Sequence, residues 1–138
     1  MTDISRLVRI LKDDTKWQKT PEPLFDDEYF VMILQAIETM FIDTGRALMF
    51  DDLVKINDDG LPYLEYDMKI DEKKYVLLCA QINFLKRVQS DVNNIVSYST
   101  DALTVTNADK PYGHIQQSID DIERERRRTY YKMVRYTI

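Results

Sequence analysis

Cysteine is almost missing from this sequence, since Cys79 is its only one. One cysteine excludes a disulfide within the chain and any zinc site that several cysteines would build. Because Cys79 lies in the apolar stretch VLLCA, we expect a small core residue and not a reactive thiol. Histidine is equally scarce: the sole one, His114, follows a glycine near the start of the last predicted helix, and we expect it at the surface.

Short catalytic and cofactor motifs are missing as well. The chain has no glycine-rich phosphate loop and no nucleophile elbow, and nothing in its order brings His114 to a nucleophile and an acid. The acids at 26–28 stand where a helix N-terminus favours negative charge, which accounts for them without a metal. The acidic segment 57–60 lacks the ligand spacing of a calcium loop, so we expect a turn there. We therefore expect no enzymatic activity, no metal and no cofactor.

Glycine (3) and proline (4) are few, which favours long uninterrupted helices. No apolar run approaches the roughly 18 residues of a membrane span, and the first residues lack the apolar stretch of a secretory signal. A length of 138 residues with 44% hydrophobic residues is typical of one folded domain. We expect a single soluble domain over residues 1–138, intracellular or part of a particle, without contact to a membrane.

Both ends of the chain are more basic than its middle. Residues 1–20 carry 5 basic and 3 acidic groups, residues 119–138 carry 6 and 4, and residues 21–118 carry 8 and 17, in keeping with the net charge of −5. An acidic body disfavours the wrapping of DNA phosphates, whereas the basic ends fit an acidic partner surface.

The longest periodic stretch is 71–96, DEKKYVLLCAQINFLKRVQSDVNNIV. Its apolar residues recur every three or four positions, which predicts one long amphipathic helix with Asp71 as its N-cap. The first half is apolar nearly all round, so we expect this helix at the centre of a bundle. Three further helices are predicted at 2–17, 26–44 and 111–135. Residues 1–20 form either a docked helix capped by Thr2 or a mobile arm, and we favour the docked helix.

Two other segments have the pattern of extended chain. Over residues 64–70 apolar and polar residues alternate, and a turn at 57–60 precedes them, which predicts a β-hairpin over 53–70. Gly60 supplies the positive φ that such a turn requires. The stretch 97–107, SYSTDALTVTN, predicts extended chain that pairs with a neighbouring subunit's edge or with the hairpin. The predicted fold class is mainly α: a small helical bundle around one long central helix, with a β-hairpin insertion and an extended stretch before the C-terminal helix.

The last helix, 111–135, changes character along its length. Its apolar stripe ends about halfway, and i,i+4 ion pairs of Asp120 with Arg124 and of Glu123 with Arg127 are expected in the charge run that follows. The basic and aromatic residues that remain step by four, three and four along one face: Arg124, Arg128, Tyr131 and Arg135. Tyrosine and arginine are enriched at binding hot spots, so this face is either an interface or a solvated helix surface.

The helix KKYVLLCAQINFLKRVQSDVNNI at 73–95 leads directly into VSYSTDALTVTNADKPY at 96–112, and a helix with an arginine-rich end follows. This order resembles the head–tail connector (adaptor) proteins of tailed bacteriophages, over about residues 26–135. The hairpin at 53–70 is longer than the plain loop expected from that family.

The resemblance implies a structural role. In that family many copies, commonly twelve, form a ring under the portal, which extends the DNA channel and offers a platform to the next neck protein or the tail. Docking on the portal then falls to the C-terminal segment 111–138, through Arg124, Arg127, Arg128, Tyr131 and Arg135. Subunit contacts fall to Tyr98, Thr100, Leu103 and Val105. The resemblance also implies passage of genomic DNA without specific binding, and a place in the virion neck after assembly in the host cytoplasm.

A second interpretation, of another class, stays open. The chain could be a small cytosolic helical regulator that binds nucleic acid or a protein partner through its basic C-terminal helix. A gel shift with duplex DNA at physiological salt separates this regulator from a ring component, because the acidic body of a channel subunit should not retain DNA.

Overall fold

Helices dominate the architecture. The computed structural model describes residues 1–47, 50–98 and 114–137. Within them the elements follow the order β1 (Thr2–Asp3), α1 (Ile4–Thr15), α2 (Asp26–Asp43), α3 (Phe50–Leu53), β2 (Val54–Ile56), β3 (Pro62–Leu64), α4 (Ile70–Tyr98) and α6 (Ile115–Thr137). These helices and a small antiparallel sheet confirm the predicted fold class, a mainly α bundle with a hairpin insertion.

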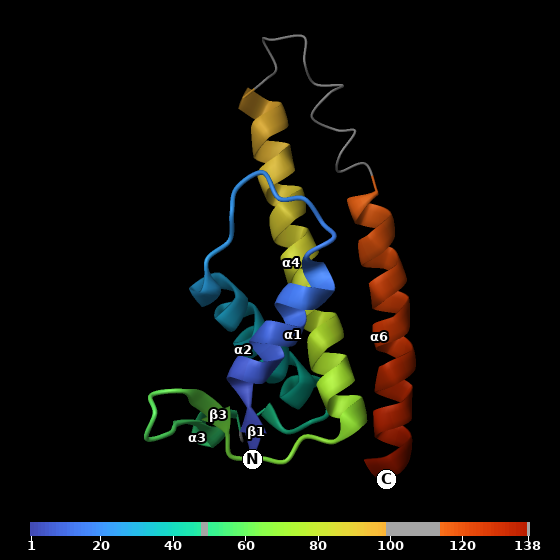
Figure 1. Cartoon of the computed structure of the whole chain (residues 1–138). Coiled ribbons are helices and arrows are strands. Elements are labelled where there is room, and N and C mark those ends of the chain that lie inside the picture. The colour runs from blue at the N-terminus through green and yellow to red at the C-terminus, as the bar shows by residue number, and fades with distance from the viewer. Residues whose placement is uncertain (48–49, 99–113, 138) are drawn as a thin grey trace.

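α4 is the helix around which the others pack (Figure 1). α6 runs antiparallel along one side of it, and α1 and α2 cover the other side of its N-terminal half. Four residues of the predicted apolar stripe are buried in the core, Ile82, Leu85, Val88 and Val92, and its first member, Leu78, is half-buried. Val76 and Ala80, from the apolar first half of the helix, are buried too. The helix begins at Ile70, one residue before the predicted cap Asp71. The Glu72 carboxylate accepts the Lys69 N–H at 3.0 Å and so closes the first turn.

The C-terminal end of α4 corrects one prediction. The helix continues to Tyr98, so Ser97 and Tyr98 are helical and not extended. Local composition favoured extended chain there, but an existing helix propagates easily, because each added residue gains one hydrogen bond for one fixed pair of dihedral angles. The remainder of the predicted extended stretch, from 99 to 107, lies outside the described residues.

The N-terminal segment is packed into the fold. α1 contributes a stripe of buried side chains, Ile4, Leu7, Val8 and Leu11. Its N-cap is Asp3, whose carboxylate accepts the Ser5 N–H at 2.9 Å. The predicted cap, Thr2, lies in β1 instead, where its hydroxyl donates to the Tyr66 carbonyl at 2.7 Å and accepts the Met68 N–H at 3.1 Å. Both partners are distant in the sequence, so local pattern could not reveal them.

The predicted hairpin is present but shorter. β2 and β3 pair antiparallel with Val54 opposite Leu64, and Gly60 turns the chain at a φ of +76°, as predicted. β1 adds a third strand, with Thr2 opposite Leu64, which gives the order β1-β3-β2. The alternating segment after Leu64 is not a strand, and Ile70, its predicted end, is 86% exposed in the first turn of α4. Alternation indicated a half-buried segment there, but it did not supply a pairing partner.

A charged cluster joins the segment after α2 to the first turn of α4. The Arg46 guanidinium donates to the Glu72 carboxylate at 2.8 Å and to the Tyr66 hydroxyl at 2.7 Å. It also lies over the rings of Phe41 and Tyr66, 5.0 and 5.4 Å from their centroids. Burial disfavours the charge of Arg46, but hydrogen bonds to Glu72 and Tyr66 outweigh burial and raise the pKa of Arg46. We call these four residues the Arg46 cluster.

Candidate functional site

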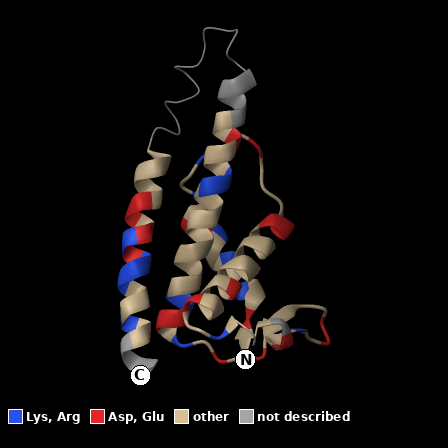
Figure 2. Cartoon of the chain, turned by 180° about the vertical axis from the view of Figure 1, so that it is seen from behind, with Lys and Arg blue, Asp and Glu red and all other residues tan. Residues whose placement is uncertain are grey.

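α6 presents two chemically different faces. One face packs against α4 and buries Ile115, Ile119, Thr129 and Met133. The Thr129 hydroxyl is satisfied there, because it donates to the Glu125 carbonyl at 3.0 Å. The charged residues of α6 appear as blue and red bands along the helix in Figure 2. Most of the cations among them point away from the core.

The exposed side of α6 carries Arg124, Arg127, Arg128 and Tyr131, which we call the basic face. The Arg124 and Arg128 side chains are 63% and 68% exposed, and Tyr131 is 70% exposed. Steps of three and four residues place these positions on one side of the helix. The structure thus brings together four of the five residues predicted to dock a partner. The fifth, Arg135, follows Tyr131 by one turn, and its side chain lies outside the described part.

The arginines of the basic face make loose ion pairs. Arg124 Nη1 lies 3.9 Å from an Asp121 carboxylate oxygen, and Arg128 Nη1 lies 3.7 Å from one of Glu125. Glu125 is engaged more closely by Lys74 of α4, at 2.9 Å, and this hydrogen bond lowers the pKa of Glu125. Exposed pairs of this kind contribute little to stability. The guanidinium groups therefore remain available to a partner.

The prediction of i,i+4 ion pairs in α6 is wrong. Arg124 pairs with Asp121 and not with Asp120, which instead accepts a hydrogen bond from the glutamine four residues before it, at 3.0 Å. Arg127 forms no ion pair with Glu123 or with any other described residue. Helical side chains lean toward the preceding turn, where neighbours three and four residues away are both in reach, so spacing alone does not select one.

A pocket of about 320 Å³ opens on the flank of α6, and we call it the flank pocket. Its lining combines three tyrosines, two arginines and one acid: Tyr75, Tyr130, Tyr131, Arg126, Arg127 and Asp43. The Tyr75 hydroxyl donates to the Asp43 carboxylate, and burial together with this bond raises the pKa of Tyr75. Cys79, beside Arg126, is buried as predicted, and burial raises its pKa to about 11. Its thiol is therefore protonated and unreactive at neutral pH.

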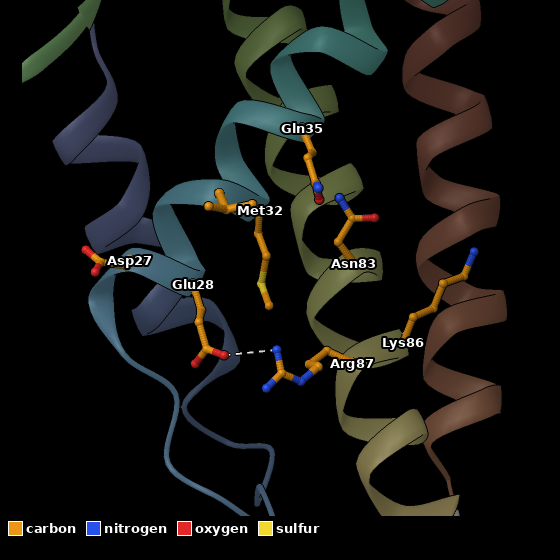
Figure 3. A pocket seen from close by; sticks show the side chains of 8 residues that line it. Asp27, Glu28, Met32, Gln35, Asn83, Lys86 and Arg87 are labelled. Carbon is orange, nitrogen blue, oxygen red and sulfur yellow. Dashed lines mark ion pairs between the residues drawn. The ribbon is translucent and has the colours of Figure 1, made fainter.

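A second hollow, of about 450 Å³, lies between α2 and α4 (Figure 3). Glu28 of α2 and Arg87 of α4 form an ion pair at 2.9 Å across it. The Glu28 carboxylate also accepts the Phe25 N–H, a bond that lowers the pKa of Glu28. Asp26 pairs with Lys12 of α1. Glu28 thus closes the helix start, as the position of the acids predicted, and Asp26 and Glu28 also form ion pairs, whereas Asp27 forms none within the described residues.

An apolar hollow of about 580 Å³ lies between α1, the start of α2 and the hairpin. Ile56 and Leu61, which flank the hairpin turn, belong to its lining, and Ile56 is 72% exposed. Neither residue is among the predicted site residues. Their signal in the sequence was a pair of large hydrophobic residues on either side of an acidic turn, where polar residues are usual.

The structure does not bring the other predicted site residues together into a site. His114 is exposed, as expected. Within the described residues no three His, Cys, Asp or Glu side chains gather closely enough to hold a metal ion, and no helix there is long and apolar enough to cross a bilayer. Of the predicted subunit contacts, Tyr98 is the last residue of α4, with its side chain not described. The others, Thr100, Leu103 and Val105, lie outside the described residues.

Comparisons of this chain with protein-family models, with curated proteins and with solved structures find no match. The functional assignment therefore depends on the geometry of the chain itself, and above all on α6.

Proposed function

We propose that this protein is a structural, non-enzymatic subunit of a bacteriophage neck. In this role several copies form a ring between the portal and the tail, extend the DNA channel and provide the platform for the next neck protein or the tail. The basic face of α6 contacts the portal. The sequence resemblance to head–tail connectors motivates the identity of the partner, and the geometry of α6 supports the docking role.

One observation carries this proposal: the two faces of α6 differ in burial and in charge. The apolar face holds the helix on α4, whereas the basic face has two arginines more than 60% exposed and a tyrosine 70% exposed. A large aromatic ring and guanidinium groups are the side chains most enriched at binding hot spots. Because these side chains hardly contribute to the core, they can bind a partner without lowering the stability of the fold.

Assembly into a ring needs a further pair of surfaces on each subunit, because ring contacts join two different patches. Large hydrophobic side chains are exposed on elements other than α6, in the segment between α1 and α2, on α2 and on the hairpin: Trp17, Phe25, Val31, Ile42, Ile56 and Leu61. Of these, Ile56 and Leu61 lie together in one hollow, and a contiguous exposed apolar patch is typical of an interaction surface. They support a subunit that contacts neighbours through one side and the portal through another.

The acidic body supports the channel role. Residues 21–118 carry 17 acidic and 8 basic groups, so a ring of such subunits presents negative charge to passing DNA. Proteins hold DNA mainly by neutralising its phosphates with Lys and Arg, and a negative wall does not do so. DNA would therefore pass without being retained.

The direct experiment mixes the protein with purified portal rings and images the complexes by electron microscopy. We expect an added ring of density on one end of the portal. A parallel gel shift with duplex DNA at physiological salt should show no retarded band. Absence of the added ring together with strong, salt-sensitive DNA binding would overturn the proposal and favour the nucleic-acid-binding regulator.

A further inference from the structure

The flank pocket contains two arginines that form no ion pair within the described residues. On α6, Arg124 and Arg128 each approach a carboxylate, whereas Arg126 and Arg127 form no ion pair within the described residues. Arg126 faces the thiol of Cys79, which is neutral and does not balance its charge. The Arg126 Nε atom is buried without a hydrogen-bond partner. Burial disfavours the charge of Arg126, but the hydrogen bond to Cys79 and the nearby charge of Glu123 outweigh burial and raise the pKa of Arg126. What remains unmet is the buried Nε–H group, which an anion in the pocket would satisfy.

Two of the three tyrosine hydroxyls in the lining also have no partner within the described residues. The hydroxyls of Tyr130 and Tyr131 make no hydrogen bond within the described part of the chain. The carboxylate in the lining, Asp43, already accepts the Tyr75 hydroxyl. The lining thus offers two guanidinium groups and two phenols against one engaged carboxylate, and its formal charge is positive.

We propose that the flank pocket binds a carboxylate side chain, an Asp or Glu presented by an acidic segment of the partner protein. This inference rests on the proposed docking role of α6 and names the chemistry of the partner's surface. A guanidinium group forms paired, charge-assisted hydrogen bonds with a carboxylate. Tyrosine rings at the rim cover the aliphatic part of an inserted side chain while their hydroxyls reach its polar end.

A nucleic-acid phosphate suits the pocket less well. A duplex phosphate is fixed on the surface of a stiff double helix, whereas a carboxylate at the end of a side chain can enter a pocket of about 320 Å³. There the carboxylate meets the two arginines and the tyrosine hydroxyls. The basic face then attracts the partner over a distance, and the pocket fixes its register.

Hexaglutamate serves as the probe in a first experiment on the isolated full-length chain, with its dissociation constant measured by calorimetry. We expect Arg127→Gln and Tyr131→Phe to weaken binding, and the arginine change to do so at least about tenfold. Both positions are exposed, so neither change should affect folding. The matched control is Lys132→Gln, which removes a charge from the same helix outside the pocket and should alter the affinity less than about threefold.

A second readout locates the ligand. In nitrogen-15 spectra of the wild type, hexaglutamate should shift the Arg126 Nε–Hε signal saturably, whereas hexalysine should not. Equal weakening by Lys132→Gln and Arg127→Gln, or an unmoved Arg126 signal, would overturn the pocket, because diffuse attraction would then explain the binding. Tighter binding of inorganic phosphate or duplex DNA than of hexaglutamate would overturn it in favour of a phosphate ligand.

The same variants mixed with portal rings separate this inference from the proposed function. If Arg127→Gln and Tyr131→Phe attach to the portal normally, the pocket does not bind the partner, while the docking role of the rest of α6 is unaffected. Hexaglutamate bound in the pocket with no attachment to the portal would have the opposite meaning: the site would stand, and the portal would not be its partner. Loss of attachment in both variants with full attachment of Lys132→Gln is the result that supports both.

Discussion

The Arg46 cluster and the basic face of α6 are both built on arginine, yet their surroundings differ. Arg46 is 25% exposed and donates at 2.8 Å to Glu72, which is 6% exposed. Arg128 is 68% exposed and lies 3.7 Å from Glu125. Breaking a buried pair leaves an uncompensated charge, whereas an exposed pair is worth little. The first region therefore holds the fold together, and the second is free to serve recognition.

Arg46→Ala should produce the largest loss of stability, about 3 kcal/mol in the free energy of unfolding. It leaves the buried Glu72 carboxylate without its cation and removes the contact with two aromatic rings. Urea unfolding followed by far-UV circular dichroism measures the loss. The matched control, Arg128→Ala, should stay within about 0.5 kcal/mol of the wild type. Similar losses in both variants would abolish the contrast between the two regions.

Thr2→Val should destabilise the protein by about 1–3 kcal/mol. Valine keeps the shape, but it leaves the Tyr66 carbonyl and the Met68 N–H without their partner in a buried place. Thermal unfolding of Thr39→Val is the control, because that hydroxyl donates to the Gln35 carbonyl on an exposed helix face. An unchanged melting temperature for Thr2→Val would mean that water replaces the lost hydrogen bonds, and that the N-terminal strand is less firmly held than the structure indicates.

The smallest expected effect concerns pH and the rim of the basic face. The hydrogen bond from Lys74 lowers the pKa of Glu125 in the folded state, so this pair stabilises the fold above the ordinary pKa of Glu and loses its contribution as pH falls through the lowered value. Between about pH 6 and about pH 3 the wild type should therefore lose slightly more stability than Glu125→Gln. Unfolding curves at several pH values measure the difference. If the difference in stability between the two proteins stayed constant with pH, the ion pair of Glu125 with Lys74 would not contribute to stability.

Local periodicity predicted the parts of this fold that depend on near neighbours. The stripe of α4 and the buried face of α1 follow from residues three and four apart, and the turn at Gly60 follows from the conformational freedom of glycine. The pairing of β1 and the Arg46 cluster escaped prediction, because they join Thr2 and Arg46 to residues far along the chain. Periodicity predicts which face of an element is buried, but it does not predict which residues pack against that face.

The candidate site divides in the same way. Spacing predicted that Arg124, Arg127, Arg128 and Tyr131 share a face, and the structure exposes that face. Arg126 was missed because it stands inside a run of arginines that look alike in sequence. One signal could have found it: Arg126 follows the buried Ile119 by seven residues, so it continues the apolar stripe toward α4.

The central claim is that the basic face recognises a partner and does not hold the fold. Attachment to portal rings and the free energy of unfolding, measured on the same samples of the Arg124→Glu, Arg128→Glu double variant, test it most directly. Arg6→Glu with Lys16→Glu, at exposed positions near the other end of the chain, gives a control of equal charge change. We predict that the α6 variant loses attachment at wild-type stability while the control attaches normally. Attachment by the α6 variant, or its unfolding, would contradict the account.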